Sequence, residues 1–267
     1  MKKNRMAVEN TAPKKEYKQS KQRKEESNHL ATKVIITIVL LIVGIVFIFV
    51  SGAFDIAEII VEQNAKVSAE QIISFSEIQK GTNIFAISKK TITSKIKENS
   101  YINDVQIKRV LPNKIKLIVE ERTVDYVLQL ANSYVFIDKQ GYVLEISTDK
   151  PEVPIILGFT TDLSNIKEND RLESADLKKM NKIAKIMETA SNHQIENLIT
   201  KIDVSNEMDY TIYLDTEGKI AYLGDGTELN TRFLYIKKLL EIKQGKSGEI
   251  LVNGDLNSEY VYFRENV

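Results

Sequence analysis

The chain has 267 residues and carries 37 Lys or Arg against 37 Asp or Glu, so its formal net charge at pH 7 is zero. It contains no Cys, which excludes disulfides, zinc–thiolate sites and thiol chemistry. Its two His residues provide too little material for a Ser-His-Asp triad or a His-rich metal site. We therefore expect a protein that is not an enzyme, with no catalytic residue, no cofactor and no metal site.

Charge is distributed unevenly along the chain. Residues 1–33 contain ten Lys or Arg and four Glu, which gives this tail a net charge of +6 and the rest of the chain a net charge of −6. Apolar residues are too sparse in the tail to be buried, so we expect residues 1–33 to be disordered. The acidic remainder argues against nucleic acid as a partner.

Residues 34–54 form an apolar run without a single charge. A membrane-spanning helix needs about 20 such residues to cross roughly 30 Å of hydrocarbon. Basic residues beside such a helix stay in the cytoplasm. The expected topology is therefore that of a single-pass type II protein of the cell membrane, with residues 1–33 cytoplasmic and residues 55–267 extracellular.

A cleaved signal peptide is the alternative. Ser51 and Ala53 have the small-residue spacing that a signal peptidase accepts, which makes Ala53 the candidate cleavage site. The apolar run, however, exceeds the roughly 7–15 residues of a signal peptide, and the basic region before it is unusually long. We expect an uncleaved anchor.

Residues 55–123 predict one small domain with the order strand, helix, helix, strand, strand. The first strand is expected over residues 56–62. Ser68 opens the first helix as its N-cap, and Gln71 completes a capping box. Ser88 caps a second helix that runs to about residue 98.

The last two strands of this domain form a hairpin within residues 101–122. Apolar residues alternate with polar ones on both sides of Pro112-Asn113, so one face of the hairpin is buried. The residues of that face are Val105, Ile107, Ile115, Leu117 and Val119. At its end, Glu121 and Arg122 are expected to be a solvated ion pair worth less than about 1 kcal/mol.

Residues 124–267 predict a β-rich domain with flanking helices, which makes the fold class α+β. The expected strands are 126–130, 134–137, 142–146, 198–204, 210–214, 219–223, 249–253 and 259–264. Gly224-Asp225-Gly226 lacks the later Gly-Lys-Ser/Thr of a phosphate-binding loop, so we interpret it as a turn.

Two amphipathic helices are expected among these strands. One covers residues 174–190 and the other begins at Asn230 as its cap and ends near residue 243. Their expected buried residues are Leu177, Met180, Ala184 and Met187 in the first, and Leu229, Phe233, Ile236 and Leu240 in the second. The expected exposed side of the second helix consists of Arg232, Tyr235, Lys238 and Glu241.

The C-terminal strand predicts a binding surface. A strand at the edge of a sheet has unpaired N–H and C=O groups, to which a partner can add a strand of its own. Tyr260, Val261, Tyr262 and Phe263 have the aromatic character of interface cores. Because side chains alternate along a strand, only one set of these residues can face outward, while the other fills the core.

The order of these motifs resembles the FtsQ/DivIB family of bacterial cell-division proteins, and residues 55–123 resemble its POTRA domain. The resembling fragments are Ile59-Ile60-Val61, Val67-Ser68, Gly81 with Asn83-Ile84-Phe85, Tyr101-Ile102, and Arg109, Leu111, Pro112, Asn113, Ile115, Leu117, Val119, Glu121 and Arg122. The chain departs from the family at Gln63, where the family usually has Gly, and at Leu251, where it commonly has Asp.

The resemblance implies a non-catalytic divisome scaffold at the division septum. It implies that FtsL-like and DivIC/FtsB-like membrane proteins bind the C-terminal part of the extracellular domain, in a complex with other divisome proteins. The corresponding residues here are Arg232, Tyr235, Asn253, Gly254, Tyr260, Val261, Tyr262 and Phe263. The alternative is a membrane-anchored POTRA protein that binds exported or unfolded polypeptide.

Overall fold

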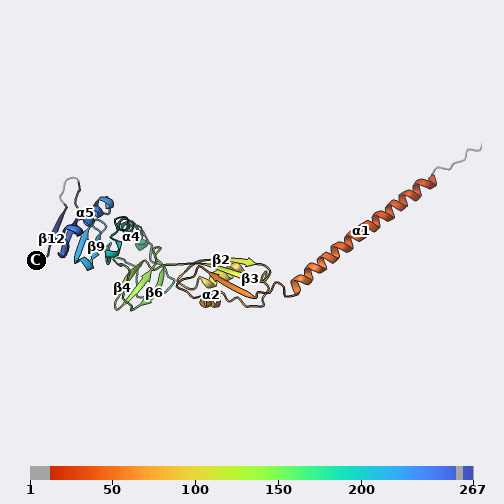
Figure 1. The fold of residues 1–267 in the computed structure, drawn as a ribbon, viewed down its shortest axis with the longest axis horizontal. Coiled ribbons are helices and arrows are strands. Elements are labelled where there is room, and N and C mark those ends of the chain that lie inside the picture. Colours follow the sequence, from red (N-terminus) through yellow and green to blue (C-terminus); the bar gives the residue numbers. More distant parts are fainter. Residues whose placement is uncertain (1–12, 257–260, 267) are drawn as a thin grey trace, which may run out of the picture. The chain divides into compact units, whose positions relative to one another are not determined.

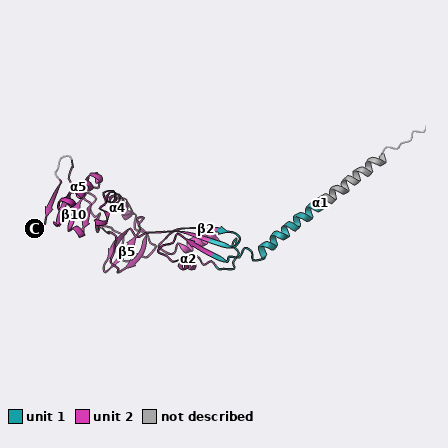
Figure 2. Ribbon diagram, in the orientation of Figure 1, with its two compact units in different colours: residues 1–58, 79–87, 109–115 teal, residues 59–78, 88–108, 116–267 magenta. Residues whose placement is uncertain are grey.

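The structure is a computed structural model that describes residues 13–256 and 261–266, with side chains from residue 31 onward. Its architecture is α+β, with one N-terminal apolar helix, a POTRA-like region and a β-rich C-terminal region (Figure 1). The chain divides into two compact units (Figure 2). The first unit contains residues 1–58, 79–87 and 109–115, and the second contains residues 59–78, 88–108 and 116–267.

Helix α1 runs without interruption over Pro13–Val50. The expectation that residues 1–33 are disordered is therefore wrong for residues 13–33, whereas residues 1–12 lie outside the described part of the chain. Lys, Arg, Gln and Glu are good helix formers, and the apolar segment provides a nucleus from which the helix extends at little cost. Pro13 fits the first helical position, where its missing N–H is no loss.

The apolar part of α1 that can cross a membrane is Ala31–Val50. The helix ends four residues before the predicted residue 54 because Gly52 adopts a left-handed conformation, with φ of +77°, which favours glycine just after a helix. The N–H of Ser51 still donates to the carbonyl of Phe47 (2.9 Å). Phe54 therefore lies in the connection that follows the helix.

A three-stranded sheet follows, with strand order β1-β3-β2. Its elements are β1 (Glu58–Glu62), α2 (Ala69–Ser76), α3 (Lys89–Ile96), β2 (Ile102–Val110) and β3 (Lys114–Glu121). The capping box of Ser68 and Gln71 and the Ser88 cap are present, as predicted. All five residues expected on the buried face of the hairpin are at most 5% exposed, so this prediction is confirmed.

The prediction of a solvated Glu121–Arg122 pair is wrong. The carboxylate of Glu121 accepts the backbone N–H groups of Lys66 (2.7 Å) and Val67 (3.0 Å). The guanidinium of Arg122 donates to the carboxylate of Asp138 at 2.5 Å, with both side chains buried, and lies 3.9 Å from the ring centre of Tyr142. Both side chains thus hold elements of the second unit together.

The C-terminal region contains a nine-stranded sheet with the order β12-β11-β10-β9-β8-β7-β4-β5-β6. Its strands are β4 (Tyr126–Leu130), β5 (Ser133–Ile137), β6 (Val143–Ser147), β7 (Ile155–Leu157), β8 (Lys201–Asp203), β9 (Thr211–Leu214), β10 (Lys219–Tyr222), β11 (Gly248–Leu251) and β12 (Tyr262–Glu265). Strands β4, β7 and β8 are parallel to one another, as are β10 and β11. Residues 224–226 form a turn, as predicted.

Helices α4 (Ser174–Asn192) and α5 (Leu229–Ile242) share one hydrophobic core with these strands. The predicted buried face of α4 is partly wrong: Ala184 is exposed, and the buried residues are Asp176, Met180, Ile183, Ile186 and Ala190. The buried face of α4 differs from the predicted one because it includes Asp176, whose carboxylate accepts hydrogen bonds from the N–H groups of Thr160 and Thr161. For α5 the predicted apolar stripe is confirmed, whereas Asn230 lies inside the helix, which has Glu228 as its N-cap.

Candidate partner-binding site

Strand β12 is the outermost strand of the nine-stranded sheet (Figure 1). It pairs antiparallel with β11, with Phe263 opposite Ile250 and Tyr262 opposite Leu251. Phe263 and Val261 pack against the hydrophobic core, whereas the side chain of Tyr262 is 50% exposed. The predicted alternation therefore places Tyr262 outside; Tyr260 lies outside the described residues.

The free edge of β12 can be assigned to particular backbone groups. The N–H of Asn266 donates to the carbonyl of Ser247 (3.0 Å), which makes these two residues a hydrogen-bonded pair of the ladder. Such pairs alternate along an antiparallel ladder, so Arg264 and Tyr262 also point their backbone groups toward β11. The backbone groups of Phe263 and Glu265 consequently point away from β11, where no described strand lies.

Two ion pairs lie at the C-terminal end of β12. Arg264 pairs with Glu249 across the two strands (2.9 Å), and Glu265 pairs with Lys246 (2.7 Å). Both pairs are solvent-exposed and contribute little to stability. They make the edge polar on the C-terminal side of Tyr262.

Arg232, predicted on the exposed side of α5, is only 4% exposed, and this prediction is wrong. Its guanidinium donates to the carbonyls of Thr227 (2.9 Å), Val252 and Gly254 (3.1 Å). A guanidinium has five N–H donors in a fixed fork, which suits a group of backbone carbonyls. Arg232 thus holds the segment that leads from β11 toward β12, a role that helical periodicity alone cannot reveal.

The other predicted residues fall into two groups. Asn253 is exposed and its amide donates to the carboxylate of Asp209 (2.8 Å), while Gly254 is held through its carbonyl by Arg232. Tyr235 is exposed on α5. The structure therefore brings Asn253 and Gly254 together beside Arg232, just beyond Leu251, which pairs with Tyr262.

Sequence reasoning missed Ile242, a large apolar residue that is 62% exposed at the end of α5. It lies seven residues after Tyr235, a spacing that puts both on one face of a helix. This face is distinct from the buried stripe of α5. The sequence could have indicated this face, because Tyr235 and Ile242 are apolar, seven residues apart and outside the buried stripe.

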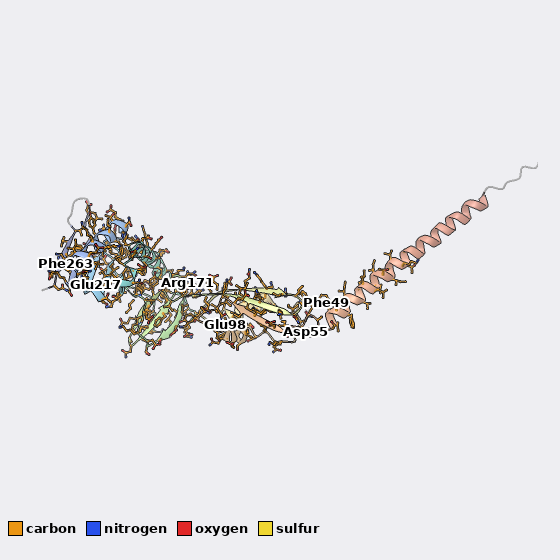
Figure 3. All side chains as sticks on the ribbon, in the orientation of Figure 1. Phe49, Asp55, Glu98, Arg171, Glu217 and Phe263 are labelled. Carbon is orange, nitrogen blue, oxygen red and sulfur yellow. The ribbon has the colours of Figure 1, made fainter. Side chains whose placement is uncertain are left out.

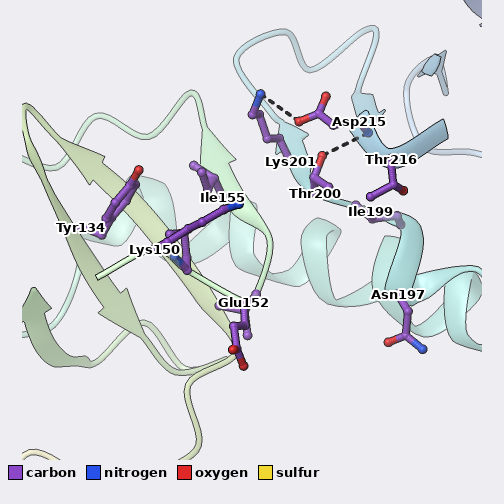
Figure 4. A pocket seen from close by; sticks show the side chains of 12 residues that line it. Tyr134, Lys150, Glu152, Ile155, Asn197, Ile199, Thr200, Lys201, Asp215 and Thr216 are labelled. Atoms are coloured by element: carbon purple, nitrogen blue, oxygen red, sulfur yellow. Dashed lines mark hydrogen bonds and ion pairs between the residues drawn. The ribbon is translucent and has the colours of Figure 1, made fainter. Parts of the chain in front are cut away.

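A cleft of about 450 Å³ lies elsewhere in the second unit (Figure 4). Two of its charged groups pair with each other, because Lys201 contacts Asp215 at 3.1 Å. Burial opposes ionisation of Asp215, but hydrogen bonds from Lys201 and Thr200 outweigh it and leave its pKa below the ordinary value. A carboxylate whose pKa is lowered by an ion pair is a weaker general base than a free carboxylate. Within the described residues, no group of three or more His, Asp or Glu could hold a metal ion.

One apolar helix long enough to cross a membrane, followed by a β-α-α-β-β region, is consistent with a single-pass membrane protein that carries a POTRA domain. Residues 54–122 match the family described as POTRA domain, FtsQ-type. The chain is a homologue of the bacterial cell-division proteins named DivIB and FtsQ, and the resemblance described above is confirmed.

Three relatives illustrate the similarity. The chain is 27% identical over 207 residues to Cell division protein DivIB of Clostridium botulinum, covering 76% of this chain and 80% of that protein. It is 28% identical over 229 residues to Cell division protein DivIB of Clostridium tetani, covering 81% and 83%. It is 23% identical over 196 residues to Cell division protein FtsQ of Syntrophotalea carbinolica, covering 72% and 67%.

Proposed function

We propose that this protein is a non-catalytic scaffold of the division machinery that binds FtsL-like and DivIC/FtsB-like membrane proteins at the septum. The observation that carries the proposal is the open edge of β12 with the exposed Tyr262 beside it. A partner strand added there would gain main-chain hydrogen bonds to Phe263 and Glu265 and contact with an aromatic ring. Tyr235 and Ile242 on α5 provide a second exposed apolar surface for a helical partner segment.

The proposed setting is the cell membrane, with the N-terminus cytoplasmic and the C-terminal region extracellular. The basic residues of the first 33 positions lie on one side of the apolar part of α1, and the acidic remainder lies on the other. Basic residues near a membrane helix favour the cytoplasmic side, which supports this orientation.

Binding by strand addition can be tested with a proline in β12. Glu265→Pro removes an N–H that points away from β11, and proline is tolerated in edge strands. Glu265→Ala is the matched control, because it removes the ion pair with Lys246 and keeps the N–H. Both full-length variants, purified in detergent, would be titrated with the extracellular segments of the FtsL-like and DivIC-like proteins from the same organism.

We expect Glu265→Pro to weaken binding by roughly five- to tenfold, the cost of about one main-chain hydrogen bond, and Glu265→Ala to bind like the parent protein. Equal binding by both variants would exclude strand addition at this edge. If the folded parent protein binds neither segment, alone or together, the scaffold proposal fails. Binding of a permanently unfolded polypeptide in their place would favour the polypeptide-binding alternative.

A further inference from the structure

The first compact unit contains an aromatic cluster made of Phe49, Phe54 and Phe85. The ring centres lie 5.1 Å apart for Phe49 and Phe54, 5.5 Å for Phe49 and Phe85, and 5.3 Å for Phe54 and Phe85. Phe49 belongs to the last turn of the segment that can cross a membrane, and Figure 3 labels it close to Asp55. Phe85 comes from a loop of the POTRA region, so the cluster joins that region to the end of the span.

Backbone hydrogen bonds fix this loop to the segment that leaves α1. The N–H of Ile84 donates to the carbonyl of Phe54 (2.8 Å), and the N–H of Ile56 donates to the carbonyl of Thr82 (2.9 Å). Asp55 and Asn83 form an isolated antiparallel bridge. These backbone hydrogen bonds therefore hold the loop that carries Phe85 next to the end of α1, where Phe49 lies.

The turn of the β2–β3 hairpin belongs to the same unit. Its residue Asn113 accepts the N–H of Ala57 (2.9 Å). Arg109 donates to the carbonyls of Ile84 (2.7 Å) and Ile87 (3.1 Å), and its guanidinium lies 5.8 Å from the ring centre of Phe85. The hairpin turn is thus fixed beside the loop that carries Phe85.

Apolar side chains are exposed on this turn and this loop. Leu111 is 59% exposed, Phe85 45% and Val110 39%, and they are accompanied by the exposed Pro112. Phe85 contacts the end of α1 through Phe49, and the turn with Val110, Leu111 and Pro112 belongs to the same compact unit. A water-soluble domain would gain nothing by exposing these apolar residues. A residue in contact with the last turn of a membrane span lies at the headgroup level, where aromatic and apolar side chains partition favourably.

We propose that Phe85, Val110 and Leu111 form a lipid-contact surface, by which the POTRA domain is seated in the outer headgroup region of the membrane. The proposal rests on α1 being the membrane anchor. The occupant of the surface is the bilayer itself, because Phe85 contacts Phe49 in the last turn of the segment that can cross a membrane. Arg109 holds the hairpin turn with Val110 and Leu111 beside the loop of Phe85. The loop of Phe85 and the β2–β3 turn would thereby be held at the membrane surface by contacts with lipid as well as by the covalent connection to α1.

The absence of Cys in the chain allows the proposal to be tested with single labelled cysteines. Leu111→Cys, Val50→Cys and Met208→Cys would each be spin-labelled in the full-length protein, reconstituted into vesicles of phosphatidylethanolamine and phosphatidylglycerol. Val50 is the reference within the span, and Met208, which is 75% exposed in the C-terminal region, is the aqueous reference. The measured quantity is collision of each label with a water-soluble nickel chelate and with oxygen.

We expect the label at Leu111 to collide with the nickel chelate severalfold less often than the label at Met208, because the water-soluble chelate is excluded from the apolar part of the bilayer. It should resemble the label at Val50 in its accessibility to oxygen. A label at Leu111 as accessible to the chelate as that at Met208 would overturn the proposal. If Leu111→Cys does not fold, Val110→Cys is the replacement probe, with the same expected result.

A second variant tests the aromatic cluster. Phe85→Ala removes the ring that contacts Phe49, whereas Phe75→Ala removes an exposed ring of α2 that takes no part in the cluster. We expect Phe85→Ala to raise the accessibility of the Leu111 label to the chelate severalfold, and Phe75→Ala to leave it unchanged. An unchanged label in Phe85→Ala would overturn the role of Phe85. Partner binding is a separate readout, so failure of the lipid contact and failure of the scaffold function are distinguishable.

Discussion

At the scale of single residues, the buried guanidinium of Arg232 fixes the backbone beside the candidate binding site. Three backbone carbonyls, those of Thr227, Val252 and Gly254, receive its hydrogen bonds. Burying carbonyls without a donor costs free energy. The conformation of the segment directly after β11 therefore depends on this one residue.

We expect Arg232→Met to lower the free energy of unfolding by about 2–4 kcal/mol, because it keeps the apolar stem and leaves three carbonyls without their donor. Arg264→Met is the matched control: Arg264 is exposed in β12, and loss of its ion pair with Glu249 should cost less than about 1 kcal/mol. Urea unfolding of the two full-length variants measures the difference. Equal costs would show that the buried hydrogen bonds of Arg232 add nothing.

At the scale of elements, α4 is docked through a carboxylate. Asp176 is fully buried and accepts the N–H groups of Thr160 (2.8 Å) and Thr161 (2.7 Å) and the hydroxyl of Thr161 (2.6 Å). Burial alone would raise the pKa of Asp176, but the hydrogen bonds from Thr161 and Thr160 and the charge of Lys179 outweigh it and hold the pKa below the ordinary value. The helix thus starts on a charged, hydrogen-bonded contact.

This contact makes part of the stability dependent on pH. Because the pKa of Asp176 is lower in the folded than in the unfolded chain, its contribution is fully present above the unfolded pKa of about 3.9 and is lost as the pH falls through the folded value. We expect Asp176→Asn to cost about 1–3 kcal/mol at pH 7 and to flatten the loss of stability below about pH 4. Unfolding curves between pH 7 and pH 3 measure both effects.

Asp162→Asn is the matched control for this prediction. The pKa of Asp162 is also below its ordinary value, because of hydrogen bonds from Ser164 and Asn165, but the carboxylate is exposed in a loop. Its replacement should change stability little at any pH. A pH profile of Asp176→Asn that is parallel to that of the parent protein would contradict the assignment.

The same elements show how far the sequence could predict the fold. The capping box of α2 and the alternating hairpin of β2 and β3 are local patterns, and both were predictable. The buried face of α4 and the position of Arg232 were not, because each depends on a polar contact with a segment distant in sequence. The helical state of residues 13–33 does not follow from their composition alone, because it depends on the adjacent apolar helix.

The candidate site was predictable to a similar degree. Alternation along the last strand predicted that only one set of its side chains faces outward, and the structure shows which set: Val261 and Phe263 pack against the core, and β12 is an edge strand. The order of nine strands cannot be derived from their sequences, because parallel and antiparallel neighbours come from distant parts of the chain. The seven-residue spacing between Tyr235 and Ile242 could be recognised in the sequence, but the sequence alone does not show that this face of α5 is exposed.

At the scale of the whole molecule, the charge difference across α1 predicts the orientation in the membrane. Residues 1–33 carry a charge of +6 and residues 34–267 a charge of −6, and the apolar segment Ala31–Val50 lies where the two parts meet. Moving ten basic residues across a membrane is unfavourable, so the tail should remain in the cytoplasm. The same orientation places β12 and its open edge outside the cell, where an extracellular partner segment can reach it.

Single cysteines in the otherwise Cys-free chain test this orientation in intact cells. A membrane-impermeant thiol reagent should modify Met208→Cys in intact cells and Met6→Cys only after the cells are permeabilised. Both variants should have the mass of the full chain, because we expect no cleavage at Ala53. Modification of Met6→Cys in intact cells would mean the opposite orientation, and loss of the Met6 label with a shortened chain would mean that the anchor is cleaved. In either case α1 would no longer anchor the chain with its C-terminal region outside the cell, and both the lipid contact of Leu111 and the extracellular presentation of β12 would lose their basis.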